Sequence, residues 1–351
     1  MPNRVSASDP ETRRRVAVGR RASAFCCSLL AAAAWMAPVP CSGEDVLAEP
    51  ISVLSRPTPA TSFAQPMGVA VDTVGGLLII ADTGNHRIRV FDLDGYPIVS
   101  FLHRVDGQRG PTDGEPTAIS VDRQGNLFIL DTQADYVDVM DLLGNKLGRI
   151  VPSELARTLP GSPAGGSSQD YQPVALALDP QDRLVLAVGA PASRIWLLDE
   201  NRAVRLTFDG TEQGGSPLGA ITDLFVDGEG KIYATDGTLT PAVRVFSPEG
   251  REVLSFGQRE TGDQNFSLPG SVVATEDGRI WVVDSIRQVV KVFDRDGGVL
   301  GMLGGLGRRR GEFLYPSRVT TDGRDRLFVL ERVGCRLTTY RIHEMAESVR
   351  P

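Results

Sequence analysis

The stretch Pro66-Met67-Gly68-Val69-Ala70-Val71-Asp72 is followed by Gly76-Leu77-Leu78-Ile79-Ile80-Ala81-Asp82 and by Asn85-His86-Arg87-Ile88-Arg89-Val90-Phe91-Asp92. Related phrases return about six times along the chain, at a spacing of roughly 50 residues that is typical of propeller blades. The clearest landmark is the aspartate that ends the first segment, which recurs at Asp122, Asp179 and Asp227.

Each copy has the pattern of four short β-strands. Residues 69–71 are a short apolar segment before an Asp-x-x-Gly turn, in which the aspartate can accept hydrogen bonds from the backbone that follows it. Residues 77–81 are almost entirely apolar, as expected for a strand covered on both faces. Residues 88–91 alternate in polarity, and residues 97–101 supply an outer strand. We therefore predict an all-β fold, a six-bladed β-propeller of four-stranded antiparallel blades.

The sixth copy predicts how the ring closes. It ends soon after Arg336-Leu337-Thr338-Thr339-Tyr340-Arg341-Ile342 and lacks an outer strand of its own. A strand-like segment at residues 51–54 lies upstream of the first copy. We predict that this N-terminal strand completes the last blade, because an uncovered sheet edge invites aggregation.

The N-terminal region differs from the repeats. Arg13-Arg14-Arg15 and Arg20-Arg21 precede an apolar run at residues 25–37, which Pro38 and Pro40 end. This order is typical of a secretory signal, and the run is shorter than the roughly 20 residues of a membrane span. We expect a signal peptide at residues 1–43, a propeller at 44–343 and a tail at 344–351. The protein would then be exported to the periplasm or the extracellular space, with an uncleaved membrane anchor as the alternative.

The composition is that of a soluble folded chain, with 23% charged and 41% hydrophobic residues. There are 44 acidic and 37 basic residues, a net charge of −7. Since residues 1–43 hold six arginines and two acidic residues, the remainder is more acidic still. Such a surface disfavours nucleic-acid binding, which depends on phosphate neutralisation. We expect a monomer with a protein partner and no membrane contact beyond the N-terminal segment.

The first copy, together with the approach Gly304-Gly305-Leu306-Gly307 to Gly311-Glu312-Phe313-Leu314-Tyr315-Pro316, resembles the NHL repeat. The resemblance covers about residues 50–343 and is weakest at residues 188–194. It implies a six-bladed propeller of the secreted bacterial type. Proteins similar to it include RNA-binding and protein-binding propellers, kinase sensor domains and a few metal-dependent lyases, so the resemblance is specific for fold and not for function.

Acidic residues occupy equivalent positions after the second strand in five copies. They are Asp82, Asp131, Asp236, Asp284 and Glu331. As a group they could bind a cation such as calcium, or a basic partner. Each could instead cap the tight turn that follows its strand by accepting backbone N–H bonds.

The connections between blades carry basic residues on the same predicted face. They are Gln108-Arg109, Gln258-Arg259 and Arg308-Arg309-Arg310. Guanidinium groups bind carboxylates and phosphates in bidentate fashion, so Arg259, Arg308, Arg309 and Arg310 are candidate anion contacts. A solvated basic loop is the alternative. The longer connection at residues 151–171 predicts either a lid or a disordered insertion.

Enzymatic chemistry finds little support in the sequence. The amidating lyases that resemble this fold need three histidines at the channel, and only His86, His103 and His343 exist. We find no lactonase-type calcium motif, nucleophile elbow or phosphate-binding glycine loop. We therefore expect no catalytic residues, no metal ligands and no cofactor.

The sequence favours a non-catalytic, extracytoplasmic binding or scaffold protein that uses its propeller face for interaction with a protein or another macromolecule. A metal-dependent lyase or lactonase-type hydrolase with a site at the channel mouth is the alternative, so enzymatic activity stays open. A glycan-binding module is a second alternative. Trp196 and Trp281 lie in predicted strands and are expected in the core.

Overall fold

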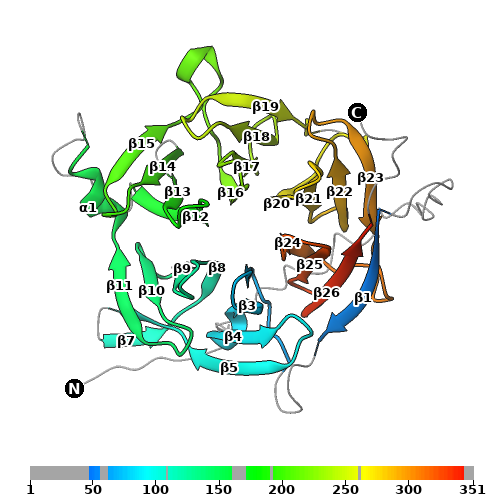
Figure 1. Ribbon diagram of the computed structural model, residues 1–351, viewed down its shortest axis with the longest axis horizontal. Helices are drawn as coiled ribbons and strands as arrows, with labels where there is room; N and C mark the ends of the chain where they lie inside the picture. Colours follow the sequence, from blue (N-terminus) through cyan, green and yellow to red (C-terminus); the bar gives the residue numbers. More distant parts are fainter. Residues whose placement is uncertain are drawn as a thin grey trace, which may run out of the picture. The chain divides into compact units, whose positions relative to one another are not determined.

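Each of the first five repeats forms one four-stranded antiparallel sheet in the computed structural model, the sixth forms such a sheet together with an N-terminal strand, and the six sheets surround a common axis (Figure 1). The structure describes residues 47–55, 62–107, 110–159, 171–189, 193–259 and 262–343. The predicted all-β, six-bladed β-propeller is confirmed.

The strands of blades one to five follow chain order. Blade one is β2 (Gly68–Asp72), β3 (Leu77–Asp82), β4 (Arg87–Asp92) and β5 (Pro97–Leu102), and blade two is β8 (Pro116–Val121), β9 (Leu127–Asp131), β10 (Val137–Met140) and β11 (Lys146–Ile150). Blade three is β12 (Gln172–Leu178), β13 (Leu184–Gly189), β14 (Arg194–Leu198) and β15 (Val204–Phe208), and blade four is β16 (Ile221–Val226), β17 (Ile232–Asp236), β18 (Val243–Phe246) and β19 (Glu252–Phe256). Blade five is β20 (Pro269–Ala274), β21 (Ile280–Asp284), β22 (Val289–Phe293) and β23 (Val299–Gly304).

Two connections carry regular structure of their own. The hairpin β6 (Arg104–Gly107) and β7 (Gly110–Asp113) lies between blades one and two. The connection to blade three begins with helix α1 (Pro152–Ala156), in which a proline occupies the first turn, where a missing backbone N–H costs nothing. Residues 160–170 of this connection lie outside the described residues.

The core lies between successive blades. Six apolar clusters each combine residues of two neighbouring blades, and together they run around the whole ring. The apolar second strands explain this arrangement, since every residue of β9, β17 and β21 is buried. Trp196 and Trp281 are both 0% exposed, which confirms that they belong to the core.

The aspartates that end the first strands form the predicted turns. Asp122 is typical, because its Oδ1 accepts hydrogen bonds from the backbone N–H groups of Gln124 at 3.0 Å and Asn126 at 2.7 Å. Asp179 accepts in the same way from Gln181 and Arg183, both at 2.9 Å. The repeated aspartate is therefore a structural element of the hairpin.

Blade six closes the ring with strands from both ends of the propeller. Its sheet has the order β1-β26-β25-β24, with β24 (Pro316–Thr321), β25 (Arg326–Glu331), β26 (Arg336–Ile342) and β1 (Ala48–Leu54). The predicted closing strand at residues 51–54 is confirmed, and it begins earlier, at Ala48. Ala48 is only 4% exposed and packs with Phe313 and Ile342 in the cluster between blades five and six.

The predicted signal segment at residues 1–43 and the tail at 344–351 lie outside the described residues. None of the helices in the described part of the chain has the length and apolar character that a membrane span requires.

Deletion of residues 44–56 removes β1 and exposes the edge of β26. We expect an insoluble or oligomeric product, measured by size-exclusion chromatography with light scattering, because an unpaired edge strand pairs with other chains. Deletion of residues 1–43 keeps β1 and is the matched control. A monomeric 44–56 deletion with the melting behaviour of the control would contradict this closure.

Candidate functional site

The turns between second and third strands and the connections between blades lie at the same end of the propeller, because neighbouring strands are antiparallel. We call this end the connection face. Backbone hydrogen bonds join the two kinds of loop, from Gly237 N to the carbonyl oxygen of Ala220 at 2.8 Å and from Ser285 N to that of Leu268 at 3.0 Å. The connection face is therefore held together by regular backbone contacts.

The structure places the predicted ring of carboxylates beneath this face. Asp82, Asp284 and Glu331 are 0% exposed, Asp236 is 2% and Asp131 is 4% exposed. Four of them accept backbone N–H groups from the connection that precedes their blade, and Asp131 Oδ1 accepts from Gln133 N at 2.8 Å within its own turn. The donors of the other four are Ala64 for Asp82, Gly219 for Asp236, Ser267 and Leu268 for Asp284, and Leu314 for Glu331. The geometry is that of caps that fix the loops.

Basic side chains from the third strands brace the same connections, and none of them is among the predicted site residues. Arg89 Nε lies 2.7 Å from Asp82 Oδ2. Arg244 donates to the carbonyl oxygens of Gly210 and Ser216 in the connection before blade four. These braces could have been predicted from the sequence, because blades one, four and five each have a basic residue near the start of the third strand.

Lys291 of blade five is the most enclosed of these braces. Its Nζ donates to the carbonyl oxygens of Asp263 at 2.8 Å and Asn265 at 2.5 Å, and its side chain is 1% exposed. Burial and, to a smaller degree, nearby Arg287 lower the pKa of Lys291 to about 8. The lysine therefore holds the connection before blade five as a cation bound to backbone carbonyls.

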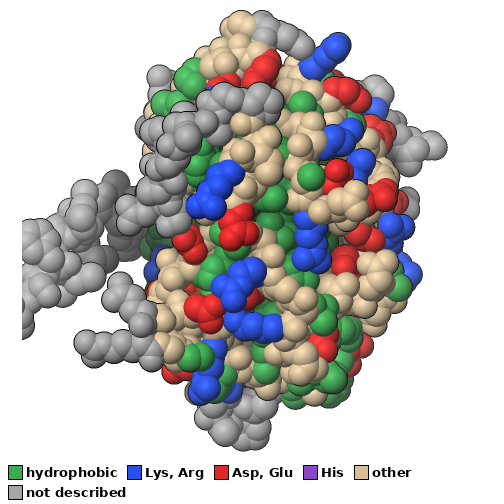
Figure 2. Space-filling model, turned by 90° about the vertical axis from the view of Figure 1, so that its left-hand side faces the viewer, with side chains coloured by type: hydrophobic (Ala, Val, Ile, Leu, Met, Phe, Trp, Pro, Cys, Tyr) green, Lys and Arg blue, Asp and Glu red, His purple; other side chains and the backbone are tan. Residues whose placement is uncertain are grey.

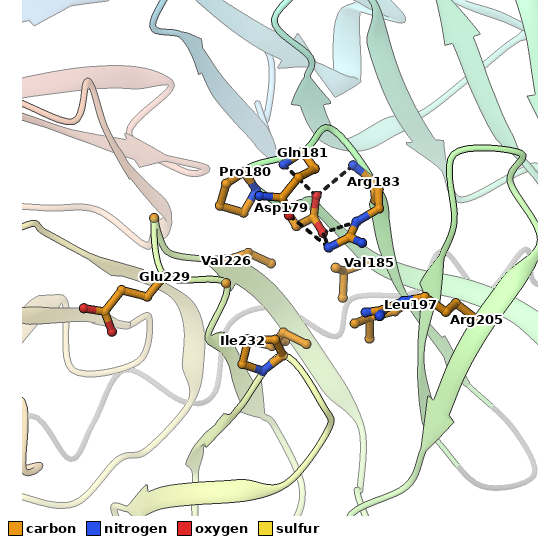
Figure 3. A pocket seen from close by; sticks show the side chains of 13 residues that line it. Asp179, Pro180, Gln181, Arg183, Val185, Leu197, Arg205, Val226, Glu229 and Ile232 are labelled. Atoms are coloured by element: carbon orange, nitrogen blue, oxygen red, sulfur yellow. Dashed lines mark hydrogen bonds and ion pairs between the residues drawn. The ribbon is translucent and has the colours of Figure 1, made fainter.

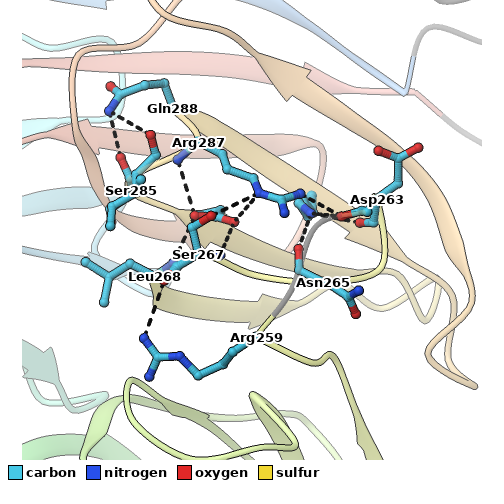
Figure 4. A network of polar contacts seen from close by, with 12 residues as sticks. Arg259, Asp263, Asn265, Ser267, Leu268, Ser285, Arg287 and Gln288 are labelled. Carbon is cyan, nitrogen blue, oxygen red and sulfur yellow. Dashed lines mark hydrogen bonds and ion pairs between the residues drawn. The ribbon is translucent and has the colours of Figure 1, made fainter. Parts of the chain in front are cut away.

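Arg259 belongs to the same network (Figure 4). Its Nη1 donates to the carbonyl oxygen of Gly237, and its Nη2 lies 3.5 Å from that of Ser267. The guanidinium thus joins the turn of blade four to the connection that follows this blade. Gln108 and Arg109, the other predicted basic pair, lie outside the described residues.

Arg308, Arg309 and Arg310 lie in the connection between blades five and six, residues 305–315, which we call the arginine loop. All three side chains are exposed. Arg310 Nη2 donates to the carbonyl oxygen of Pro50 in β1. Within the described part of the chain, no side-chain hydrogen bond or ion pair involves Arg308 or Arg309, so these two guanidinium groups face solvent.

The backbone of the arginine loop is fixed from within. Phe313 is 0% exposed, its N–H donates to the carbonyl oxygen of Gly305 at 2.7 Å, and its own carbonyl oxygen accepts from Gly307 N at 3.0 Å. Glu312 Oε2 accepts from Arg309 N at 2.8 Å. These contacts fold the loop around one buried aromatic ring.

Arg336 fixes the arginine loop from blade six. Its Nε lies 2.5 Å from Glu331 Oε1, and its two terminal nitrogens donate to the carbonyl oxygens of Arg308 at 2.7 Å and Glu312 at 2.6 Å. Since Glu331 is itself buried, this ion pair gives the loop a rigid support. Arg308 and Arg309 are thus presented on an ordered backbone.

Blade two inverts the charge pattern. At the position of Arg89 its third strand has Asp138, which is 2% exposed, and the nitrogen-bearing side chain is His103 in the connection. His103 Nε2 lies 3.3 Å from Asp131 Oδ2 and 3.7 Å from Asp138 Oδ2. Both ring nitrogens of His103 and both of these oxygens are buried without a hydrogen bond. Lys146 Nζ approaches Asp138 Oδ2 to 3.5 Å.

Burial governs the pKa of each group in this cluster. It lowers the pKa of His103 to about 4, against the attraction of Asp138. It raises the pKa of Asp131 and of Asp138 above the usual carboxyl value. All three shifts favour neutral forms, as expected where water is excluded. Gly114 is required beside them, because a Cβ there would lie 2.3 Å from Asp131 Oδ2.

The axial channel carries a different ion pair. Arg318 of β24 donates through Nη1 to the carbonyl oxygens of Gly270 at 2.8 Å and Thr222 at 3.1 Å, and lies 3.8 Å from Asp223 Oδ1. One arginine therefore reaches across the inner strand of blade five to that of blade four. Burial raises the pKa of Asp223, although Arg318 opposes the shift.

Two other parts of the surface are less suited to binding a ligand than the arginine loop. A small pocket between blades three and four, at the end opposite the connection face, is lined by Asp179, Arg183, Arg205 and Glu229 (Figure 3). Its Asp179 is already bonded to Arg183 Nε at 2.7 Å. The outer side of the ring around α1 and β11 shows basic and acidic side chains interspersed where it is visible (Figure 2).

Within the described residues, no group of three or more histidine, cysteine, aspartate or glutamate side chains is placed to hold a metal ion. Cys335 is a free, half-buried thiol.

The NHL repeat pattern matches residues 63–91, which contain β2, β3 and most of β4. Mouse NHL repeat-containing protein 3 is 25% identical over 234 residues, 66% of this chain and 52% of the relative, and its human counterpart is 24% identical over the same length. The chain spans about half the length of these curated relatives. It thus carries an NHL repeat in the first blade of a six-bladed propeller.

Solved structures share the fold at low identity. A gluconolactonase from Xanthomonas campestris has a TM-score of 0.55 at 16% identity, covering 79% of this chain and 86% of that chain. Virginiamycin B lyase from Staphylococcus aureus has 0.54 at 12%, covering 83% and 99%. A chain in the nidogen/laminin complex has 0.50 at 17%, covering 68% and 79%.

Replacement of Asp284 by alanine leaves the N–H groups of Ser267 and Leu268 without their acceptor. We expect the free energy of unfolding to fall by about 2 kcal/mol, because unsatisfied buried donors are costly. Urea denaturation measures this. Asp296→Ala, at an exposed turn position, is the control and should change stability by less than about 0.5 kcal/mol. Equal effects of the two substitutions would show that the buried carboxylate is not a cap.

Replacement of Asp138 by asparagine should stabilise the protein at pH 7.5 and do so less at pH 3.5. The folded-state pKa of Asp138 is raised by burial, so its ionised form costs stability above that pKa, and the cost vanishes below the unfolded pKa. Asp141→Asn should behave oppositely, since hydrogen bonds from Asn145 lower the pKa of Asp141. Thermal melts at both pH values test this, and destabilisation by Asp138→Asn at pH 7.5 would refute it.

Proposed function

We propose that this propeller is a non-catalytic binding or scaffold protein, exported from the cytoplasm, that holds a partner protein on the connection face of blades five and six. One observation carries the proposal. The arginine loop is rigidly supported by Glu312, Phe313 and Arg336, yet the guanidinium groups of Arg308 and Arg309 face solvent.

Rigidity matters because binding must overcome the entropy of ordering flexible side chains and loops. A loop whose backbone is already fixed loses less freedom when a partner docks. Guanidinium groups on such a loop suit bidentate contacts with carboxylates. Of the four arginines singled out by sequence, Arg308 and Arg309 fit this role. Arg259 and Arg310 already bond backbone oxygens.

Proteins with a similar fold include a member of a protein complex and two enzymes. A similar fold occurs in a nidogen/laminin complex, which is an association between proteins. Similar folds also occur in a lyase and a gluconolactonase, so a metal-dependent enzyme remains the alternative. The glycan-binding alternative lacks an exposed indole in the described residues, since Trp196 and Trp281 are fully buried.

The double variant Arg308→Ala/Arg309→Ala should weaken partner binding by about tenfold or more, because it removes both free guanidinium groups. Affinity purification of the tagged protein from its native envelope identifies the partner, and titration with that partner measures the loss. The melting temperature should stay within about 2 °C, since exposed substitutions change stability little.

Arg251→Ala/Arg295→Ala is the matched control. It removes the same charge from exposed arginines in the β18–β19 and β22–β23 turns, at the opposite end of the ring. Equal binding by both double variants would refute the proposed face. Recovery of no partner with any of the proteins would count against a scaffold and favour the metal-dependent alternative.

A further inference from the structure

We infer that the segment recognised on this face is an acidic stretch of polypeptide that also carries a large aliphatic or aromatic side chain. This inference rests on the proposed function and specifies the chemistry of its partner. The surface concerned consists of Ile286, Leu306, Val333, Arg308 and Arg309, which we call the mixed patch.

Three exposed aliphatic side chains set the mixed patch apart. Leu306 is 68% exposed, Ile286 57% and Val333 56%. Leu306 lies in the arginine loop, and the other two lie in the second-to-third strand turns of blades five and six. Single exposed apolar residues are ordinary, but a group of them within a polar rim is typical of an interaction site.

Backbone contacts place these residues on one surface. Arg332 N donates to the carbonyl oxygen of Tyr315 and Gly334 N to that of Leu314, both at 2.9 Å, so Val333 is held against the end of the arginine loop. Tyr315 N donates to Gln288 Oε1, which ties the loop to the turn that carries Ile286. The arginine loop therefore lies between the two turns.

The corresponding turns elsewhere do not combine an exposed aliphatic side chain with a free guanidinium group. Blade one has Thr83 and Asn85 in this turn, and blade two has Thr132 and Gln133. In blade four Leu239 is 41% exposed, but the adjacent Arg259 bonds the carbonyl oxygen of Gly237. The combination of aliphatic side chains with free guanidinium groups thus belongs to one sector of the connection face. A partner that needed charge alone would gain nothing from the aliphatic side chains.

The positive charge of the mixed patch determines which kind of apolar segment can bind there. The chain as a whole has a net charge of −7, so the mixed patch is a local basic site on an acidic protein. The carboxylates that support the arginine loop are occupied, Glu312 with Arg309 N and Glu331 with Arg336. Carboxylates of a partner would bind Arg308 and Arg309, while an adjacent apolar side chain covers Leu306 and Val333. A polyphosphate backbone offers no such side chain, and the acidic body repels it.

Selection of a displayed random peptide library on the immobilised full chain tests this inference. We expect enriched peptides that place aspartate or glutamate beside leucine, isoleucine or phenylalanine. Their affinity should fall about tenfold or more on Arg308→Ala/Arg309→Ala and equally on Leu306→Ser/Val333→Ser, and should be unchanged on Arg251→Ala/Arg295→Ala. The exposed positions of all six residues let melting temperatures verify that each variant folds.

The inference is overturned if no peptide is enriched, if enriched peptides lack acidic or apolar residues, or if the Leu306→Ser/Val333→Ser variant binds them as wild type does. Binding of the native partner to the same variants distinguishes a failure of this inference from a failure of the proposed function. If it is lost on the arginine variant and kept on the Leu306→Ser/Val333→Ser variant, the proposed function stands and the acidic-apolar segment is wrong. If it is kept on both, the proposed function fails as well.

Discussion

The connection face depends on one hydrogen-bonded contact, a buried carboxylate at the end of a second strand that accepts backbone N–H groups of the preceding connection. Irregular loops have backbone donors without ladder partners, and buried donors must be satisfied. The carboxylate of Asp284 accepts two such hydrogen bonds, from the backbone N–H groups of Ser267 and Leu268. In blades one, four, five and six this acceptor fixes where the connection crosses onto its blade. The rest of the loop can then vary, as the arginine loop does, without disturbing the ring.

Sequence periodicity was sufficient to predict the blades, their turns and the closing strand, because each follows from local polarity and turn chemistry. It also identified the acidic positions and offered a cap of the following turn, which Asp131, Asp236 and Asp284 make, but it did not predict the bonds to the preceding connection. It could not show which arginines are free. Arg259 bonds the carbonyl oxygen of Gly237 and Arg310 that of Pro50, and both partners come from another blade. Such contacts depend on loop conformation, which a repeat pattern does not encode.

Blade two shows what happens when the bracing pair is reversed. With an acidic residue at position 138 in place of the usual cation, the group from the connection that faces the two carboxylates is the imidazole of His103, which burial keeps neutral. A histidine is a weaker brace than arginine, since burial readily removes its charge. The hairpin of β6 and β7 is instead bonded to blade two through Asp106, which pairs with Arg149 at 2.8 Å, whereas blades one and five have Arg89 and Lys291 in their third strands.

Blade six couples the order of the arginine loop to closure of the ring. The arginine loop is bonded to Arg336 of β26 and to Pro50 of β1, which are the last and the first strands of the ring. During synthesis the loop emerges before Arg336 does, so its support cannot form until the final strand has left the ribosome and met the first. A truncated or incompletely folded chain would present a loose loop. A binding site formed by this loop would therefore be complete only in a ring that has closed.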